Sequence, residues 1–434
     1  MPLGRMLFAV VITNLLWGLI PIPAVEAMKS YSLFTMLLFR FFYTSLACFL
    51  LVGVLRIRSP EVKGIGAYLT STNRAYGRRN VPQLLSLVIV AFMLSVSLTL
   101  FFFSYNLVGV VIATMVSESI TPVLLAFWNW AKGTEKIDIL KLIYMTLLVL
   151  AVLVISLARV EADAAVKSIG FLFVAICAVF WTAYIALIAK DTPSRKETEA
   201  VRFSVGNYRM ARSTLKLGVT FMFSGLMIFP LVLGLPLFSQ EPELVSQCNR
   251  FFDDLSSNLF SASLNMDILV LSFGLTFVPY FLLYAAQAFW PKEALTFDQW
   301  SSILGLITPL VAAYVGILIL GELVRMDYIL IATVFLVTSI AMRYFHEVTN
   351  KVVGFIFLEI DLAKKSKVYS QLKGIRELQE IHAITGKESD IYAEAVTSNL
   401  NHLYLLVSQK IRAIDGVRNV DVELVQKIRT PKRK

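Results

Sequence analysis

Two ionisable side chains, Arg40 and Glu118, interrupt runs of apolar sequence long enough to cross a membrane. An ionised group inside a bilayer costs at least a few kcal/mol unless it is paired or hydrated, so such residues are candidates for function. An arginine there can hold a substrate carboxylate or phosphate, and a glutamate can bind a substrate amine or exchange a proton. The alternative is a structural ion pair that clamps two helices together.

The depth of these two residues in their predicted helices favours a shared site. Arg40 lies about eight residues into the predicted span 32–55, and Glu118 about ten into the span 108–130, both counted from the same side of the membrane. At 1.5 Å per residue, both side chains fall roughly 12 to 16 Å deep, near the middle of the bilayer. We therefore predict that they face one cavity and pair across it.

Aromatic and polar residues of the second half are predicted to form the opposite wall of this cavity. Tyr280, Tyr284 and Gln287 share one helix face, because they are spaced by four and three residues. Tyr184 lies deep in an earlier apolar run and joins them. For Tyr184, Tyr284 and Gln287 the alternative role is packing between helices.

Three prolines are predicted to shape the cavity and its gates. Pro122 and Pro309 each follow Ile-Thr inside an apolar run, and Pro21 lies in the first such run. A proline inside a helix removes a backbone hydrogen bond and can kink the helix, and Thr121 and Thr308 can satisfy the freed carbonyl groups. We favour this shaping role over direct contact with a substrate.

The chain that carries these residues is strongly apolar. Of its 434 residues, 57% are hydrophobic and 16% are charged, and its mean hydropathy is +0.71, which excludes an ordinary soluble globular protein. Alternating ten-residue patterns typical of a membrane β-barrel are missing, whereas apolar runs of helical length recur ten times. The sequence predicts an all-α polytopic membrane protein with ten transmembrane helices, at approximately residues 3–25, 32–55, 84–104, 108–130, 139–158, 169–189, 215–238, 268–290, 300–320 and 328–344.

The distribution of basic residues predicts the orientation of the chain. Loops on one side of the predicted spans carry 17 Lys and Arg, and loops on the other side carry 5. Basic loops stay in the cytoplasm, so we predict a multi-pass protein of the cell membrane with both termini cytoplasmic and the acidic loop 239–266 outside. This bias also accounts for the net charge of +10 without a nucleic-acid partner, because basic loops lie beside anionic lipid.

Two segments of the chain repeat one another. Ile120-Thr121-Pro122 aligns with Ile307-Thr308-Pro309. In each copy a glutamate, Glu135 or Glu322, follows thirteen residues after the proline and ends the apolar run. We interpret both glutamates as caps or hinge contacts for the helix that follows, since both are predicted to lie at a membrane surface.

The repeat extends through both halves of the membrane region. LLWG at 15–18 aligns with VFWT at 179–182, whereas Glu118 stands opposite Gly305 and so belongs to one copy alone. Five spans per copy is an odd number, so the second copy must enter the membrane from the opposite side. Inverted repeats are typical of alternating-access transporters, whose substrate site lies near the bilayer midplane. The predicted domains are two five-helix repeats, at residues 1–160 and 161–346.

These features resemble the drug/metabolite transporter superfamily, and within it the EamA-like permeases. The matching residues are Trp17, Gly18, Pro21, Arg40, Pro122, Gly133, Glu135, Pro309, Gly321 and Glu322. The resemblance implies ten helices and secondary transport of small organic solutes, often the export of amino acids or related metabolites. It also adds Trp17 to the predicted substrate-binding residues.

After the last predicted span the chain changes character. From Val352 onward the pattern predicts the order βαββαβ, the split ferredoxin-like arrangement. GFIFLEIDL at 354–362, TGKESDIYAEA at 385–395 and DGVRNVDVELV at 415–425 resemble the ligand-binding domain of Lrp/AsnC transcriptional regulators, also called the RAM domain. The predicted cytoplasmic domain covers residues 350–430.

The second resemblance implies a dimerising module that often binds amino acids beside the loop of Gly386 and Asp390. Gly386 permits a tight turn, and Asp390 can accept a hydrogen bond from an amine. The alternative is that both residues only form a β-turn. The regulators carry a DNA-reading helix-turn-helix before this domain, and here the last membrane span takes that position, so no nucleic-acid partner is expected.

Together these features predict a homodimeric secondary transporter, an exporter of amino acids or related small metabolites, regulated or dimerised through a cytoplasmic amino-acid-sensing domain. The alternative is a non-transporting membrane receptor or scaffold whose tail senses a ligand or recruits partners. An enzyme is not expected, because the sequence offers no nucleophile constellation, no HExxH or CxxC pattern and no Walker-type lysine motif. No metal or cofactor is expected.

Overall fold

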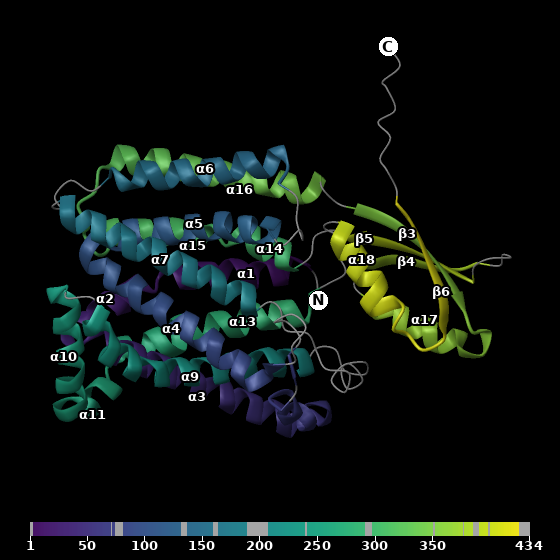
Figure 1. The fold of residues 1–434 in the computed structure, drawn as a ribbon, viewed down its shortest axis with the longest axis horizontal. Coiled ribbons are helices and arrows are strands. Elements are labelled where there is room, and N and C mark those ends of the chain that lie inside the picture. Colours follow the sequence, from purple (N-terminus) through teal and green to yellow (C-terminus); the bar gives the residue numbers. More distant parts are fainter. Residues whose placement is uncertain are drawn as a thin grey trace, which may run out of the picture.

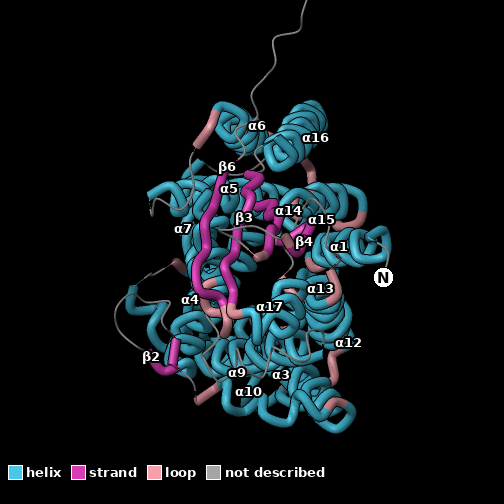
Figure 2. The backbone as a smooth tube through the Cα atoms, turned by 90° about the vertical axis from the view of Figure 1, so that its right-hand side faces the viewer, coloured by secondary structure: helices cyan, strands magenta, loops and turns pink. Residues whose placement is uncertain are grey.

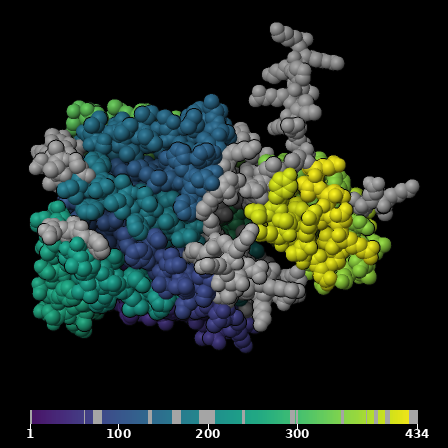
Figure 3. Space-filling view, viewed as in Figure 1, coloured from purple at the N-terminus to yellow at the C-terminus, as the bar shows by residue number. Residues whose placement is uncertain are grey.

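A computed structural model describes residues 3–70, 72–73, 81–131, 137–158, 164–188, 207–238, 241–290, 297–349, 352–375, 377–384, 390–397 and 400–424. Figure 1 shows a bundle of long helices with a smaller α+β domain beyond one end. We call this end the domain end. We call the opposite end the far end; it carries α10 (Pro242–Ser257) and α11 (Leu259–Ser263). In the space-filling view, the yellow C-terminal domain is a separate body beyond the domain end (Figure 3).

The described bundle contains ten helical spans long and apolar enough to cross a membrane, which confirms the predicted fold class. Seven are single helices: α3 (Leu33–Arg58), α4 (Gln83–Val108), α5 (Val110–Ala131), α6 (Ile139–Ser156), α7 (Ala164–Ile188), α9 (Asn207–Phe238) and α16 (Met326–Thr349). The first span comprises α1 (Leu3–Gly18) and α2 (Pro21–Ser30). The eighth comprises α12 (Met266–Leu269), the π-helical segment η2 (Val270–Phe277) and α13 (Val278–Ala288). The ninth comprises α14 (Phe297–Leu304) and α15 (Ile307–Leu318).

Local sequence signals explain where several of these helices begin. The Ser32 side chain accepts a hydrogen bond from the backbone N–H of Thr35 at 3.1 Å and so caps α3. Asp138 caps α6 in the same way through the N–H of Lys141, at 2.8 Å. Pro21 occupies the first position of α2, where the missing N–H costs nothing. The boundaries of α2, α3 and α6 therefore follow from single residues that the sequence displays.

Helix contacts in the bundle follow a two-fold pattern. Helix α1 packs on α13 and α15, and α7 packs on α4 and α5 in the corresponding way. Viewed along the bundle, α4, α5 and α7 lie on one side and α13, α15 and α1 on the other (Figure 2). The pairs α3 with α9, α5 with α15, and α6 with α16 join equivalent helices of the two halves. This pairing is what an inverted five-helix repeat produces.

Helix α10 forms hydrogen bonds to the residues on both sides of the turn between the first and second spans, at the far end. Its Asp254 carboxylate accepts hydrogen bonds from the Ser32 N–H at 2.7 Å and the Thr35 hydroxyl at 2.8 Å, at the N-terminus of α3. Its Arg250 guanidinium donates to the Lys29 carbonyl at 3.0 Å, at the C-terminus of α2. An anion at a helix start and a cation at a helix end both oppose the helix dipole favourably. The predicted acidic loop 239–266 therefore contains two helices, of which α10 holds this turn.

The domain end of α3 continues into a small substructure. Helix η1 (Pro60–Tyr68) follows α3, and a hairpin of β1 (Thr72–Asn73) and β2 (Val81–Pro82) precedes α4. The Tyr68 hydroxyl accepts a hydrogen bond from Gln83 at 2.6 Å. This contact ties η1 to the start of α4.

The C-terminal domain has the predicted βαββαβ order. Its elements are β3 (Val352–Ile360), a short 3-10 turn η3 (Leu362–Lys364), α17 (Lys365–Lys373), β4 (Leu378–Ala383), β5 (Ile391–Thr397), α18 (Leu400–Leu405) continued by η4 (Leu406–Ile411), and β6 (Val417–Leu424). The four strands form one antiparallel sheet in the order β4-β5-β3-β6. Alternate residues of β3 and β5 are buried, so one sheet face packs on the helices and the other carries half-buried side chains.

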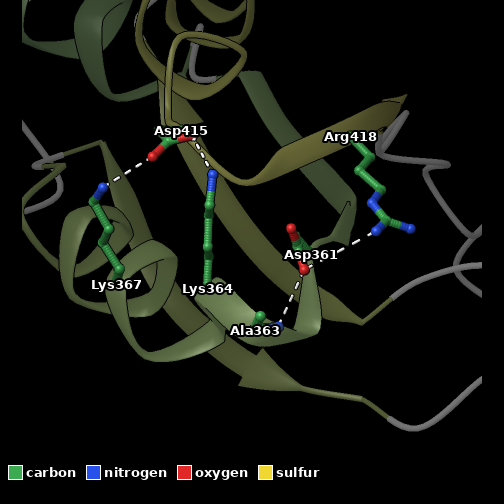
Figure 4. Close-up of polar contacts among 6 residues, drawn as sticks. All are labelled: Asp361, Ala363, Lys364, Lys367, Asp415 and Arg418. Carbon is green, nitrogen blue, oxygen red and sulfur yellow. Dashed lines mark hydrogen bonds and ion pairs between the residues drawn. The ribbon is translucent and has the colours of Figure 1, made fainter.

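A charged cluster joins α17 to the turn before β6 (Figure 4). The Asp415 carboxylate pairs with Lys364 at 2.8 Å and with Lys367 at 2.9 Å. These two ammonium groups lower the pKa of Asp415 to about 2. The next residue, Gly416, has φ +105°, and a Cβ there would lie 2.9 Å from the Lys364 Cβ. Glycine is therefore required at this turn by both its backbone and its neighbour.

Candidate functional site

A cavity of about 610 Å³ inside the bundle is the candidate substrate site. Helices of both halves build its wall, including α1, α3, α4 and α5 from the first and α7, α9, α13 and α15 from the second. Its lining reaches Ile188 and Lys216 near the domain end. The volume suits a small metabolite, since ligand pockets commonly enclose roughly 300 to 1,000 Å³.

Arg40 enters this cavity from α3 and is 5% exposed. Its Nε donates a hydrogen bond to the Thr276 hydroxyl at 3.0 Å, and its guanidinium carbon lies 5.3 Å from the centre of the Phe102 ring. Its Nη1 is buried and has no hydrogen-bond partner among the described residues. The guanidinium therefore keeps an unused donor at the cavity, where leaving it unpaired costs free energy.

The partner of Arg40 is positioned by the π-helical segment η2. The Thr276 hydroxyl donates to the Leu271 carbonyl, five residues earlier, at 2.6 Å. From α3, the Thr44 hydroxyl donates to the Ser272 carbonyl in the same segment at 3.2 Å. π-helical turns inside α-helices are frequent at functional sites. No signal in the sequence pointed to Thr276, because threonine is common in membrane helices.

Glu118 lies on the same cavity wall, on α5. No hydrogen bond or ion pair within the described part of the chain engages its carboxylate. In particular, no ion pair within 4 Å joins Glu118 to Arg40, whose Nε binds Thr276 instead. The two residues thus face one cavity, as the helix depths predicted, but they do not pair across it.

Aromatic side chains from both halves line the cavity. The Trp17 and Tyr280 rings meet edge to face with centroids 5.3 Å apart, and Trp181 stacks on Tyr184 at 5.0 Å. Tyr284 follows Tyr280 on α13, with ring centroids 6.0 Å apart. Trp17 and Trp181 stand at equivalent positions in the sequence repeat, so each half contributes one indole to the wall.

Other lining residues complete the site. Gln287 lines the cavity from α13, as its spacing from Tyr284 predicted. Asn14 also lines it from α1, and its Nδ2 donates to the Val10 carbonyl at 2.8 Å. An asparagine within the apolar run VVITNLLW was a visible signal that the sequence interpretation did not use.

The three predicted prolines occupy different positions in their helices. Pro122 lies inside the continuous helix α5, Pro309 is the third residue of α15, and Pro21 begins α2 after the break at residues 19–20. The predicted role of the neighbouring threonines was wrong in detail. The Thr121 hydroxyl binds the Ser117 carbonyl at 2.8 Å, one residue before the carbonyl that Pro122 frees.

The second threonine bonds to another helix. The Thr308 hydroxyl donates to the Asn14 side-chain oxygen at 3.0 Å, so it ties α15 to α1. It cannot satisfy a carbonyl of its own helix four residues earlier, because Thr308 is the second residue of α15; the Asn14 backbone carbonyl, at 3.3 Å, is a further acceptor. The same Ile-Thr-Pro sequence therefore makes an intrahelical contact in one copy and an interhelical one in the other.

Glu322 is a helix cap, but not of the helix that follows it. Its carboxylate accepts hydrogen bonds from the backbone N–H groups of Val110 and, at 3.0 Å, Val111, which begin α5. Gly109, with φ +85°, lets the chain turn there, and a Cβ would approach the carboxylate to 3.0 Å. An acidic group at a helix N-terminus is stabilising. The corresponding Glu135, together with Gly133, lies outside the described residues.

In the C-terminal domain, the Asp390 carboxylate accepts a hydrogen bond from the backbone N–H of Ile360 at 2.8 Å. The Asp390 N–H donates to the Leu358 carbonyl, also at 2.8 Å. These contacts hold the start of β5 against the end of β3, so Asp390 has a structural role between the two strands. Gly386, the other predicted ligand contact, lies outside the described residues.

Comparison with known proteins identifies two parts of the chain. Residues 4–157 match the EamA-like transporter family, and residues 354–434 match the Lrp/AsnC ligand binding domain. Both matches confirm the resemblances found in the sequence. No curated protein matches the chain. A solved structure titled "Crystal structure of protein" aligns with 79% of this chain and 98% of its own, at 12% identity and a TM-score of 0.46.

Proposed function

We propose that this chain, which joins an EamA-like transporter domain to an Lrp/AsnC ligand-binding domain, exports amino acids or related small metabolites by secondary transport. The substrate occupies the central cavity, and an ion gradient or solute exchange drives its passage. The second five-helix copy, residues 161–346, completes the transporter, as the two-fold helix contacts support.

One observation carries this proposal: the cavity holds an arginine with an unused donor and a glutamate with no polar partner in the described chain. Opposite charges that line one buried cavity and are left unpaired cost free energy. A zwitterion supplies both missing partners, with its carboxylate on the Arg40 guanidinium and its ammonium on the Glu118 carboxylate. Trp17 and Trp181 flank the space between the two halves.

We place the domain end of the bundle in the cytoplasm. The excess of Lys and Arg in the loops at that end supports this orientation, because basic loops are retained on the cytoplasmic side. Both termini and the C-terminal domain are then cytoplasmic, and α10 faces outward. The cavity, whose lining reaches Ile188 and Lys216, is then accessible from the cytoplasm.

We assign dimerisation and amino-acid sensing to the C-terminal domain. Its uncovered sheet face carries Phe355, Phe357 and Tyr392, with Tyr392 centred 5.4 and 5.6 Å from the two phenylalanine rings. An apolar aromatic face on a small domain gains stability when a second copy covers it. Phe355→Glu should therefore shift the detergent-solubilised full chain from dimer to monomer by light scattering. Tyr404→Glu on α18, where Tyr404 is 55% exposed, is the matched control.

The transport proposal is tested with purified full-length protein in proteoliposomes. Counterflow of labelled amino acids should be measured for the native chain, Arg40→Gln and Glu118→Gln, with circular dichroism and melting curves to confirm folding. We expect uptake of at least one amino acid that both variants lose by about 10-fold or more, since each loses a charged partner for the substrate. Robust uptake excludes the receptor or scaffold alternative; uptake that is absent throughout a full amino-acid panel contradicts the proposal.

A further inference from the structure

Two hydroxyl groups in the part of the cavity nearer the far end are buried. Tyr105, on α4, is 6% exposed, and Thr114, on α5, is 3% exposed; both line the cavity. Neither hydroxyl has a hydrogen bond of normal geometry to any described residue. Buried polar side chains are nearly always hydrogen-bonded, so each exception needs a physical explanation. Because both residues line the cavity, a bound solute can supply the missing partner.

The turn between α4 and α5 fixes the position of both hydroxyls. Tyr105 lies three residues before the end of α4, and Thr114 is the fifth residue of α5. At 1.5 Å per residue, both residues therefore lie roughly 5 to 6 Å from this turn, which is at the far end. The Glu322 carboxylate holds the turn by accepting hydrogen bonds from the N–H groups of Val110 and Val111. The two hydroxyls thus come from adjacent helices with a fixed junction.

The guanidinium of Arg40 lies beside these hydroxyls. Its carbon is 5.3 Å from the centre of the Phe102 ring, and that ring is centred 5.3 Å from the Tyr105 ring. Arg40 is close enough to Tyr105 to interact with it electrostatically, and Thr114 is a polar neighbour of the same hydroxyl. A contact between two hydroxyls uses only one of their two hydrogens, so one O–H donor remains. With the unused Nη1 of Arg40, at least two donors are therefore free at this place.

This set of donors favours an oxyanion over a neutral group. The Arg40 guanidinium has only N–H donors and cannot accept a hydrogen bond, whereas a hydroxyl can turn its hydrogen toward a solute. A carboxylate has only acceptors, on two oxygens, so it can receive hydrogen bonds from an arginine and a hydroxyl at the same time. A carboxamide has two N–H donors of its own and leaves part of the set unpaired.

Glu118 lies one helical turn from Thr114 on α5, and both line the cavity. The two residues are four positions apart, so their side chains share a helix face, with Cβ atoms roughly 5 to 6 Å apart. An α-amino acid carries its carboxylate and its ammonium group on one carbon atom. It can therefore place the carboxylate beside Thr114 and the ammonium group on Glu118.

We infer that Arg40, Tyr105 and Thr114 form an oxyanion subsite that binds the α-carboxylate of the solute, and that the two hydroxyls select carboxylates against their neutral amides. Arg40 supplies the positive charge, and the hydroxyls fix the orientation of the carboxylate. Solutes with an ammonium group but no carboxylate engage Glu118 alone. This inference rests on the proposed transport function and adds to it the residues that recognise one end of the substrate.

The test compares amino acids with their amides, which keep the side chain and the ammonium group and replace the carboxylate by a neutral group. The probes are the common amino acids, each paired with its α-carboxamide, such as L-leucine with L-leucinamide. Binding to the purified full chain is measured by titration calorimetry. At least one amino acid should bind at least about 10-fold more tightly than its amide, because hydrogen bonds to a charged group are among the stronger ones.

Removal of either hydroxyl should reduce this preference. Tyr105→Phe and Thr114→Val should each weaken binding of the amino acid by about 2- to 10-fold and leave binding of the amide nearly unchanged, so the ratio of the two affinities falls. Thr114→Ser keeps the hydroxyl and should keep most of the ratio. Melting curves confirm that each variant is folded.

Thr99→Val is the matched control. Thr99 lies on α4 and is 1% exposed, and its hydroxyl also lacks a hydrogen-bond partner among the described residues, but it does not line the cavity. Its loss should leave the ratio unchanged. If Thr99→Val lowered the ratio as much as Thr114→Val does, the effect would come from helix packing, and the subsite would be overturned.

The remaining outcomes separate the subsite from the transport proposal. Preferential binding of amino acids over amides, without counterflow in proteoliposomes, would overturn the transport proposal and leave the subsite intact. Counterflow of an amino acid that binds no better than its amide would overturn the subsite and leave the transport proposal intact. Affinities for acid and amide that fall equally in Tyr105→Phe and Thr114→Val, or that do not change, would give the hydroxyls a structural role only and overturn the inference. A native chain that binds neither member of any pair overturns it as well.

Discussion

The two copies of the Ile-Thr-Pro segment fold differently. In the first copy, α5 runs unbroken from Val110 to Ala131 through Pro122. In the second, the span is divided at residues 305–306 into α14 and α15, and Pro309 lies at the start of the second piece. The same Ile-Thr-Pro triplet is thus compatible with a continuous helix and with a broken one, so the motif alone does not decide the outcome.

Neighbouring helices explain much of the difference. Thr308 reaches the Asn14 side chain on α1. In the equivalent pair of helices, the residue of α7 that aligns with Asn14 is Ala178, which has no polar side chain, and Thr121 bonds to its own helix. The Asn14 amide therefore provides an interhelical acceptor for Thr308 that Ala178 cannot provide for Thr121.

A second pair of aligned residues acts in the same direction. A Cβ added to Gly18 on α1 would lie 2.5 Å from the Val311 Cβ, so glycine permits α15 to approach closely. On α7 the aligned residue is Thr182, whose hydroxyl donates to the Ala178 carbonyl at 2.7 Å. The α1–α15 contact joins two interrupted spans, whereas the α5–α7 contact joins two continuous ones.

This contrast suggests a division of labour between the α1–α15 helix pair and the α5–α7 helix pair. The interrupted spans supply hinges at residues 19–20 and 305–306, beside the cavity, which suit a moving gate. The continuous helix α5 carries Glu118, the carboxylate that the repeat does not share, on a rigid support. Four substitutions test this division, from the largest expected effect to the smallest.

Glu118→Gln removes the group found in one copy alone. We expect uptake to fall by about 100-fold, because the ammonium of the substrate loses a charged acceptor while the helix keeps its shape. Proteoliposome uptake at matched protein density measures this. Glu243→Gln, on the exposed face of α10, should have no effect. Unchanged uptake in Glu118→Gln would show that the carboxylate found in one copy alone has no role in transport.

Gly18→Val probes the close approach of α1 to α15. The new methyl groups collide with Val311, and we expect a destabilisation of about 2 kcal/mol, typical of an overpacked core, with a lower melting temperature in detergent. Gly18→Ala combined with Val311→Gly, which removes the Cβ that the new methyl group would meet at 2.5 Å, should recover part of the loss. The repeat-related Thr182→Ala should be tolerated. Equal losses at both positions would show that the two contacts are equivalent.

Asn14→Ala removes the side-chain acceptor of Thr308 and leaves the Asn14 backbone carbonyl, at 3.3 Å, as the remaining acceptor. Loss of the shorter hydrogen bond costs about 0.5 to 1 kcal/mol, so the variant should melt slightly earlier than the native chain. Thr121→Val, which removes an intrahelical bond in the other copy, should cost less. A double-mutant cycle of Asn14→Ala with Thr308→Val isolates the pair, and a coupling energy near zero would contradict the interhelical contact.

Gly305→Ala tests the break itself. Alanine favours helix over glycine by up to about 1 kcal/mol, so the substitution should raise stability slightly if the backbone at this position accepts it. Because a stiffer hinge opens less readily, we expect a modest fall in the uptake rate without a change in half-saturation concentration. An increase in uptake rate would count against a hinge at this position.

Much of the architecture could be predicted from the sequence, because the sequence patterns that indicate it are local. Ten apolar runs predicted ten spans, the alternation of β3 and β5 predicted a sheet covered on one face, and the repeated Ile-Thr-Pro predicted two related halves. The helix depths of Arg40 and Glu118 placed both on one cavity, because helix rise is fixed. Predictions from hydropathy, from hydrophobic periodicity and from the rise of a helix do not depend on which helices pack together.

Only the tertiary structure showed which residues are the hydrogen-bond partners of these side chains. Arg40 bonds to Thr276, 236 residues away, and not to Glu118; Glu322 caps α5, 211 residues before it, and not the helix that follows. The ninth span is broken at residues 305–306, and beside this break Thr308 contacts Asn14 on α1, which is far away in the sequence. Each of these depends on which helices pack together, and the free energy of such contacts is set by neighbours that no local pattern records.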